Sequence, residues 1–305
     1  MKIKQLFLII FLVVFIASCK KEDALTNVDN ISGLGGDTWV KGPIDKYIYD
    51  SMTVPFNASV KYKYDQFELE LNRTLVPIKE EKVIPVLSTI KKAWIDPYVA
   101  EAGLGFFKKY GSKFFVLVGS GSYDLATGAA TLGTTADAGN KIILNQLNYF
   151  NIKSSPGYKL SDSVLIKQLF HVIEHEFAHV LSYNILYPSS FNQVGARFYT
   201  SDWTNVTNAE ALNEGFLSNY AMSEVNEDFA EMVSLMMIEG KTGFDKIVNS
   251  INYTGTTVNG STAAEARSRL RQKEAIVVTY FKQSYNIDYY NLQTRTRAAL
   301  VSMIY

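Results

Sequence analysis

Residues 171–179 read His171-Val172-Ile173-Glu174-His175-Glu176-Phe177-Ala178-His179 and contain all three histidines of the 305-residue chain. On a helix, with about 100° between successive residues, the three histidines fall on one face, one turn apart from each other. Apolar residues gather on the opposite face: Ile166, Phe170, Ile173, Phe177, Val180 and Leu181. The segment is therefore predicted to be a helix whose apolar stripe enters a core while its imidazoles face a cleft.

The spacing of His175, Glu176 and His179 is typical of a zinc metallohydrolase helix. Two imidazoles on one face can bind one zinc, and Glu176 beside them can accept a proton from the attacking water. The segment also reads H-x-x-E-H across His171, Glu174 and His175, which would make Glu174 the base. Helix geometry alone does not choose between the two glutamates. A buried helix with His and Glu but no metal is the simpler alternative, although the apolar register favours a metal site.

A third metal ligand is needed, because a catalytic zinc has three protein ligands and an open fourth position. No histidine remains, so a carboxylate is expected. Residues 226–232, Asn226-Glu227-Asp228-Phe229-Ala230-Glu231-Met232, begin a second predicted helix with Glu227 and Glu231 one turn apart. Such glutamates usually belong to a solvated helix face. The incomplete zinc site on the earlier helix favours a ligand here instead.

These two motifs together resemble the gluzincin metallopeptidases, and more closely their anthrax-lethal-factor-like branch. The resemblance covers His175-Glu176-Phe177-Ala178-His179, then Tyr220, which stands seven residues before Glu227, and the run from Glu227 to Glu231. It implies that Glu227 is the third zinc ligand, that Glu231 supports a ligating histidine, and that Tyr220 stabilises the oxyanion. It covers about a third of the chain.

The same resemblance implies which glutamate is the base and which fold to expect. It favours Glu176 over Glu174 and makes His171 a neighbour of the site instead of a ligand. The expected fold class is α+β and zincin-like, with a small mixed sheet packed on the H-E-x-x-H helix and a mostly helical C-terminal part. The expected activity is that of a zinc-dependent metallopeptidase with one Zn²⁺ per chain and a peptide or protein substrate.

The expected mechanism uses zinc held by His175, His179 and Glu227 to activate a water and to polarise the scissile carbonyl. Glu176 accepts the proton of that water and delivers it to the leaving amine. Tyr220 donates to the oxyanion. A competing function is a binding component of an uptake complex that keeps a zinc fold without turnover. The enzyme is favoured, because a binding module has no chemical need of a base and an oxyanion donor together.

The N-terminus has the layout of a secretory signal, in which Lys2 and Lys4 precede the apolar run 6–17. Cys19, the only cysteine, follows small residues as in a bacterial lipobox, where the cysteine becomes the lipidated first residue. An uncleaved anchor helix is the alternative. The acyl chains on Cys19 would tether the protein to a membrane. An exported lipoprotein of the outer membrane is therefore expected. Lys20-Lys21-Glu22-Asp23 resembles the acidic surface-export signals of some bacterial lipoproteins, which favours the outer face of the cell.

The whole chain also resembles substrate-import-associated zinc metallohydrolase lipoproteins, which accompany outer-membrane nutrient-uptake systems. An outer-membrane transporter complex is therefore an expected partner. Nucleic acid is not expected, because removal of residues 1–18 leaves 28 basic and 30 acidic residues and no basic excess.

The expected domain organisation has four parts. A lipoprotein signal peptide at 1–18 and a flexible tether at 19–42 precede an N-terminal helical and strand part at 43–110 and a zincin-like metallopeptidase domain at 111–305. The predicted elements are a short helix from Pro43, a helix at 80–100, and strands at 60–64, 114–118, 129–135 and 141–145. Trp203 and Phe198 could line a substrate pocket between the two site helices, but ordinary loop packing is favoured.

Overall fold

The structure is a computed structural model that describes residues 39–63, 75–123, 130–131, 133–136 and 140–305. The predicted signal peptide, Cys19 and most of the predicted tether lie outside these residues. Val40–Tyr305 forms one compact unit. No helix in the described ranges combines the length and the apolar character needed to cross a bilayer. The boundary expected at residues 110–111 stays a prediction.

Two helical runs form the N-terminal part of this unit. The first consists of α2 (Pro43–Ile48), the π-helical turn η2 (Tyr49–Thr53) and α3 (Val54–Phe56), and it ends where Asn57 adopts a left-handed conformation. The second consists of α4 (Glu80–Ile90), η3 (Lys91–Ile95), α5 (Asp96–Ala102) and α6 (Leu104–Tyr110). Both predicted helices are therefore confirmed. Pro43 stands in the first turn of α2, where a missing backbone N–H leaves no helical bond unmade.

A small mixed sheet follows the order β1-β2-β6-β5. Its strands are β1 (Ser59–Lys61), β2 (Phe114–Leu117), β6 (Lys141–Leu144) and β5 (Gly133–Ala136). β1, β2 and β6 are parallel, whereas β5 runs antiparallel to β6 as the edge strand. β3 (Ser122–Tyr123) and β4 (Ala130–Thr131) form a separate pair. The strand predicted at 129–135 is thus divided between β4 and β5, and its residues 129 and 132 lie outside the described part. The strand predicted at 60–64 overlaps β1, and its residue 64 also lies outside the described part.

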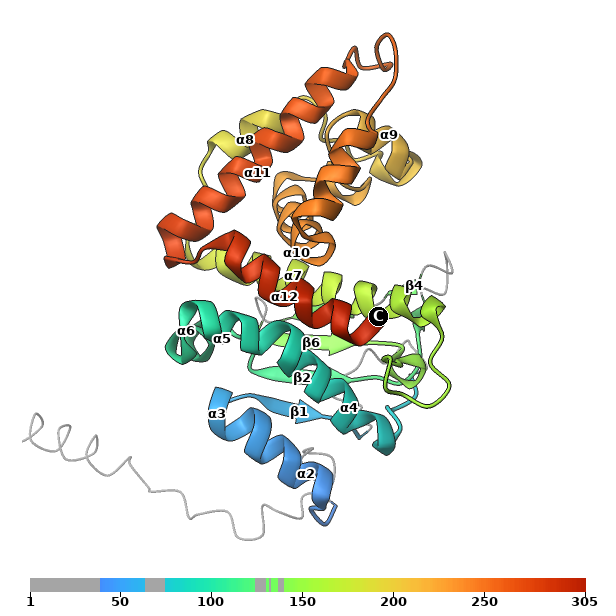
Figure 1. Cartoon of the computed structure of the whole chain (residues 1–305), viewed down its shortest axis with the longest axis vertical. Coiled ribbons are helices and arrows are strands. Elements are labelled where there is room, and N and C mark those ends of the chain that lie inside the picture. The colour runs from blue at the N-terminus through green and yellow to red at the C-terminus, as the bar shows by residue number, and fades with distance from the viewer. Residues whose placement is uncertain (1–38, 64–74, 124–129, 132, 137–139) are drawn as a thin grey trace, which may run out of the picture. The chain divides into compact units, whose positions relative to one another are not determined.

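The rest of the chain is mostly helical, as expected (Figure 1). The long helices are α7 (Ser163–Asn184), α10 (Val225–Ser250), α11 (Ala263–Tyr285) and α12 (Tyr289–Ile304). Shorter helices and turns connect them: η5 (Leu147–Tyr149), η6 (Leu160–Asp162), α8 (Ser190–Gly195), η7 (Trp203–Asn205), α9 (Asn208–Asn213) and η8 (Tyr220–Met222). The chain is therefore a mixed α/β protein dominated by helices.

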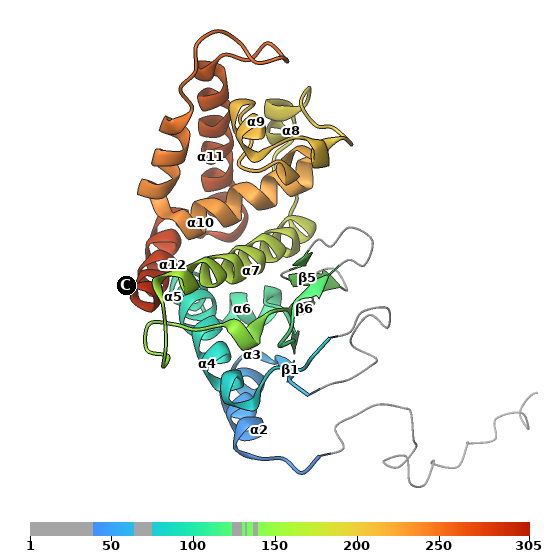
Figure 2. The same cartoon turned by 90° about the vertical axis from the view of Figure 1, so that its right-hand side faces the viewer.

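The helix α7 lies between the sheet side of the unit and α10 (Figure 2). It contacts β5, β6 and η3 on one side and α10 on the other. The apolar stripe predicted for this helix is buried, and the Phe177 ring packs 5.3 Å from Trp94 and 4.9 Å from Tyr98, centroid to centroid. This aromatic core fixes the rotation of α7 and leaves its histidine face toward α10.

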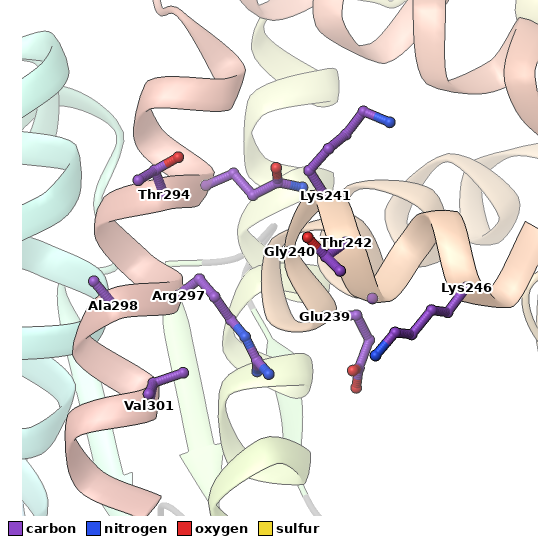
Figure 3. Close-up of a pocket in the computed structure, with 11 residues that line it drawn as sticks. Glu239, Gly240, Lys241, Thr242, Lys246, Thr294, Arg297, Ala298 and Val301 are labelled. Atoms are coloured by element: carbon purple, nitrogen blue, oxygen red, sulfur yellow. The ribbon is translucent and has the colours of Figure 1, made fainter. Parts of the chain in front are cut away.

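The helix α10 kinks at Gly240, whose φ of 69° favours glycine. A Cβ atom there would approach the Cγ of Arg297 to 3.1 Å. The guanidinium of Arg297, from α12, donates to the carbonyl of Ile238 at 2.7 Å and so satisfies an acceptor beside the kink. A cavity of about 580 Å³ opens at this point between α10 and α12 (Figure 3). Its lining does not include the histidines of α7.

Candidate metal centre

The histidine face of α7 meets the first turns of α10. The Nε2 atom of His175 lies 2.9 Å from Oε2 of Glu227 and 3.2 Å from Nε2 of His179. The Nε2 atom of His179 lies 3.3 Å from the same carboxylate oxygen. Two elements far apart in sequence thus bring two imidazole nitrogens and one carboxylate oxygen to a single point, and the three side chains are largely buried there.

These three atoms fit a zinc ion. Ligand atoms about 2.05 Å from a tetrahedral zinc lie roughly 3.3 Å apart. The observed separations of 2.9, 3.2 and 3.3 Å are close to that value, so a small opening of the His175–Glu227 contact completes the fit. Two histidines and one glutamate are also a ligand set that catalytic zinc sites use, with a fourth position left open.

Glu231 bonds the Nδ1 side of the His175 ring, opposite the Nε2 atom that meets Glu227. Its Oε1 accepts from Nδ1 of His175 at 2.9 Å and lies 2.8 Å from Nε2 of His171, and its Oε2 accepts from the Ser218 hydroxyl at 2.6 Å. Burial opposes ionisation of Glu231, but the hydrogen bonds from His171 and His175 outweigh it and hold its pKa well below the usual value. An ionised carboxylate can only accept, so Nδ1 of His175 carries the proton and Nε2 faces the metal position.

The contact between Glu227 and His175 shifts their pKa values in opposite directions. Burial disfavours the charge of Glu227, yet hydrogen bonds from His175 and His179 lower its pKa to about 2. Burial likewise disfavours a charged His175, yet its bonds to Glu227 and Glu231 raise the pKa of His175 to about 9. Histidine and carboxylate ligands bind a metal in their deprotonated forms, so metal binding at this site is expected to compete with protons.

Tyr220 and Glu176 border the same point. The Tyr220 ring stacks on His175 with centroids 5.9 Å apart and rings 29° from parallel. Burial raises the pKa of Tyr220 far above its usual value, and the carboxylates of Glu227 and Glu176 raise it further. The phenol therefore keeps its proton and can donate it to a hydrogen bond. Glu176 is half-buried on α7, close enough for its charge to act on Tyr220 and His175.

Glu174 lies on the core side of α7. It is fully buried, and its Oε2 accepts from the Tyr98 hydroxyl at 2.8 Å. Burial raises the pKa of Glu174 to about 8, although the Tyr98 bond acts in the opposite direction. A buried, protonated carboxyl cannot accept a proton from water at the histidine face. The position of Glu174 therefore disfavours the inverted H-x-x-E-H reading, although His171, His175 and Glu231 also bring three possible donor atoms together.

Sequence reasoning missed two residues of this region. Ser218 bonds Glu231, and no sequence signal marks it beyond its place two residues before Tyr220. Tyr183 stacks on His179 with centroids 5.9 Å apart, and its position one helical turn after His179 was an available signal. Tyr183 and Tyr220 therefore cover the two ends of the histidine pair.

The loop residues considered for a pocket wall are mainly packing residues. Phe198 is buried in a cluster with Ala211, Phe216, Ala221 and Met222, which confirms the loop-packing interpretation for this residue. Trp203 packs against the same cluster, and its ring lies 5.1 Å from that of Tyr220.

Comparisons with known proteins agree with this chemistry. No curated protein matches the chain. A solved structure from Bacteroides caccae, described as a "putative zinc-binding metallo-peptidase", is similar with a TM-score of 0.66 and 25% sequence identity, over 86% of this chain and 95% of that one. A family model with the same description matches residues 37–290, which include the histidine and glutamate cluster. Because this match spans most of the sequence, the chain belongs to the "putative zinc-binding metallo-peptidase" family.

Proposed function

We propose that the protein is a zinc-dependent peptidase of the gluzincin type in which His175, His179 and Glu227 bind one Zn²⁺. The observation that carries this proposal is the convergence of their three donor atoms at 2.9 to 3.3 Å, with the carboxylate of Glu231 behind His175. Family membership supports zinc binding and peptidase chemistry at the coarser level.

The assignment to the anthrax-lethal-factor-like branch is supported by the positions of three residues. Glu227 and Glu231 are one turn apart on α10, and each meets His175 from a different side. Tyr220, seven residues before Glu227, stacks on the same imidazole. This is the arrangement expected if Glu227 is a ligand, Glu231 its outer support and Tyr220 the oxyanion donor.

Each residue has a definite task in peptide hydrolysis. A zinc ion in this site supplies Lewis acidity, which polarises a carbonyl and lowers the pKa of a water toward ~7. Glu176 accepts the proton of the attacking water and returns it to the leaving amine. Tyr220, which keeps its proton, donates to the developing oxyanion, a contact worth about 10²-fold or more in rate. Glu231 keeps the Nε2 atom of His175 available and oriented.

The sheet offers a place for an extended peptide, as in zincin-like folds. β5 is one of the two edge strands of the four-stranded sheet, and it contacts α7, on which both histidines lie. An edge strand can pair with an extended chain through backbone hydrogen bonds. A peptide added to β5 would therefore run beside the histidine helix, and this supports a zincin-like arrangement.

Digestion of a peptide library by metal-free protein, with and without added zinc, tests this function. The expected result is one zinc per chain and cleavage that appears with zinc and disappears with a chelator. Stoichiometric zinc binding without any cleavage would instead favour the alternative, a catalytically silent binding component of an uptake complex. Cleavage that a chelator does not affect would contradict the metallopeptidase assignment.

We also propose that the protein is an exported outer-membrane lipoprotein anchored through acylated Cys19, with an outer-membrane transporter complex as a partner. The signal-like layout of residues 1–18 and the lipobox-like residues before Cys19 support this. Metabolic labelling with a radioactive fatty acid, followed by membrane fractionation, is the test. Wild-type protein should be labelled and found in outer membranes, and Cys19→Ala should lose both properties. Labelling that survives in Cys19→Ala would overturn the anchor assignment.

A further inference from the structure

Four rings follow one another along the histidine face of α7. They belong to Tyr220, His175, His179 and Tyr183, and successive ring centroids are 5.9, 4.8 and 5.9 Å apart. The Tyr183 ring is only 15° from parallel to that of His179, yet 63% of the residue is exposed. Tyr183 is thus in direct contact with a candidate zinc ligand while most of its surface faces solvent.

Two more exposed apolar residues follow Tyr183 at the end of α7. Leu186 is 74% exposed and Ile185 is 38% exposed, so three large apolar side chains within four residues reach solvent. We call Tyr183, Ile185 and Leu186 the apolar end of α7. Single exposed apolar residues are ordinary, whereas three within four positions, one of them against a candidate zinc ligand, are a candidate binding surface.

The backbone under this surface is fixed, so the exposure does not come from a fraying helix end. The Tyr280 hydroxyl donates to the carbonyl of Ile185 at 2.7 Å, and the N–H of Ile185 donates to Leu181 at 3.0 Å. The next residue after the surface, Tyr187, is buried and stacks on Phe229 with centroids 4.4 Å apart. The apolar end of α7 is therefore a preformed surface, which lowers the entropy cost of binding.

The surroundings in sequence favour an uncharged ligand. From Val180 to Ala196 the chain contains no charged residue. Asn184 lies between Tyr183 and Ile185 in sequence, and its side-chain amide donates back to the carbonyl of Val180 at 2.8 Å. A charged side chain placed there would lose hydration without gaining a partner from this segment.

Given the peptidase function proposed above, we propose that the apolar end of α7 is a specificity subsite that packs against a bulky aliphatic or aromatic side chain of the substrate peptide beside the scissile bond. Consecutive Cα atoms of an extended peptide are about 3.8 Å apart. The Tyr183 ring lies 5.9 Å from the imidazole of His179, so it is in reach of the side chain next to the cleaved bond or one residue further.

The test uses zinc-loaded, full-length protein and a peptide whose cleaved bond has been located by mass spectrometry. The residues that flank this bond are varied between Phe, Leu, Ala and Asp, and kcat/KM is measured for each. At one flanking position, the bulky apolar residues should exceed Ala by about 10- to 100-fold, which is the discrimination an apolar pocket achieves. The Asp peptide should be the poorest substrate.

Four variants separate the subsite from a general effect. Tyr183→Ser and Leu186→Ser should each reduce the ratio of Phe to Ala peptides about 5- to 10-fold. Tyr183→Phe should retain the ratio, because the ring and not the hydroxyl makes the contact. Tyr149→Ser is the matched control, since Tyr149 is a similarly exposed tyrosine (68%) on η5, which packs beside α4. Zinc content is measured in parallel. If Tyr183→Ser binds zinc less well than the wild type, the ratio measured for Leu186→Ser decides the test.

Different results would contradict the subsite and the peptidase function on which it rests. Absence of cleavage of every peptide by the zinc-loaded wild type contradicts the peptidase function itself. Cleavage with no preference, with a preference for Asp, or with a preference that Leu186→Ser fully retains overturns the subsite alone. A preference that follows a glycan on the peptide instead of the flanking side chain also overturns it.

Discussion

Glu174 and Glu176 flank the same histidine on α7 but lie in opposite environments. Glu174 is fully buried in the core against Tyr98, and its pKa of about 8 keeps it protonated at neutral pH. Glu176 is half-buried, and its charge acts on Tyr220 and His175. Residues two positions apart in sequence, such as these, differ by about 200° around a helix, so they lie on opposite faces. The environment, and not the residue type, therefore decides which carboxylate can be a base.

Glutamine substitutions at these two positions should give the largest contrast. Glu176→Gln should lower kcat by about 10²- to 10⁴-fold, because the variant cannot accept the proton of the attacking water. Its zinc content should be unchanged. Glu174→Gln, which replaces a protonated carboxyl by a neutral amide of similar shape, should leave kcat nearly unchanged. Steady-state kinetics with metal analysis measures both, and the opposite pattern of activity would restore the inverted motif.

The pH dependence of stability should differ between wild type and Glu174→Gln. In the folded protein the raised pKa of Glu174 keeps its proton bound up to about pH 8, whereas in the unfolded chain the carboxyl ionises near its ordinary pKa of 4.5. Between these values the unfolded state binds fewer protons, so its population is favoured as pH rises. The wild type should lose about 1.4 kcal/mol of unfolding free energy per pH unit relative to the variant.

Urea denaturation of both proteins at pH 5, 6.5 and 8 measures this difference, and the titrations of other groups cancel in the comparison. The difference should grow with pH in favour of Glu174→Gln. A constant difference over this range would show that Glu174 is not held protonated in the core.

Removal of the charge of Glu231 should act on metal binding and not on the core. Glu231→Gln should weaken zinc binding about 10- to 100-fold, the usual effect of losing the outer partner of a ligating histidine. Glu239→Gln is a matched control, because Glu239 lies on the same helix but pairs with Lys167, 2.8 Å away. Competition with a fluorescent zinc chelator gives both affinities. Equal affinities in the two variants would remove Glu231 from its supporting role.

The smallest effect is expected for Tyr98→Phe. This change removes the hydroxyl that donates to Glu174, and the loss of one hydrogen bond should cost about 1 kcal/mol in unfolding free energy. Zinc affinity and kcat should remain at wild-type values, because the Tyr98 hydroxyl donates to Glu174 on the core side of α7 and not to a residue of the histidine face. Chemical denaturation and kinetics on the same sample measure both properties. A large loss of activity would mean that the two faces of α7 are coupled.

The sequence was sufficient to predict the two site helices, α7 and α10, and the histidines and glutamates that meet between them. Local periodicity predicts the histidine face of α7 and the carboxylates of α10, and the short spacing of each motif is preserved in any helix. The choice between Glu174 and Glu176 was different, because it depends on Tyr98, 76 residues before Glu174. Periodicity contains no information about that partner, so only the resemblance to a family favoured Glu176 in advance.

Contacts between distant segments were the part that sequence could not predict. Ser218 bonds Glu231 only because the loop before η8 returns to α10. The strand predicted at 129–135 is divided between two sheets, since pairing partners and not local propensity decide where a strand ends. Tyr183 was predictable as a residue of the histidine face, but its exposure depends on how Tyr187 and Tyr280 fix the following backbone.

Zinc titration of metal-free wild type, Glu227→Ala and Glu224→Ala by isothermal calorimetry tests the metal centre most directly. Glu224 is an exposed neighbour at the start of α10 and serves as the control. The wild type and Glu224→Ala should bind one zinc with equal affinity, and Glu227→Ala should bind at least about 100-fold more weakly, because a direct ligand is lost. Wild-type affinity in Glu227→Ala would contradict zinc coordination by the two histidines of α7 and the carboxylate of α10.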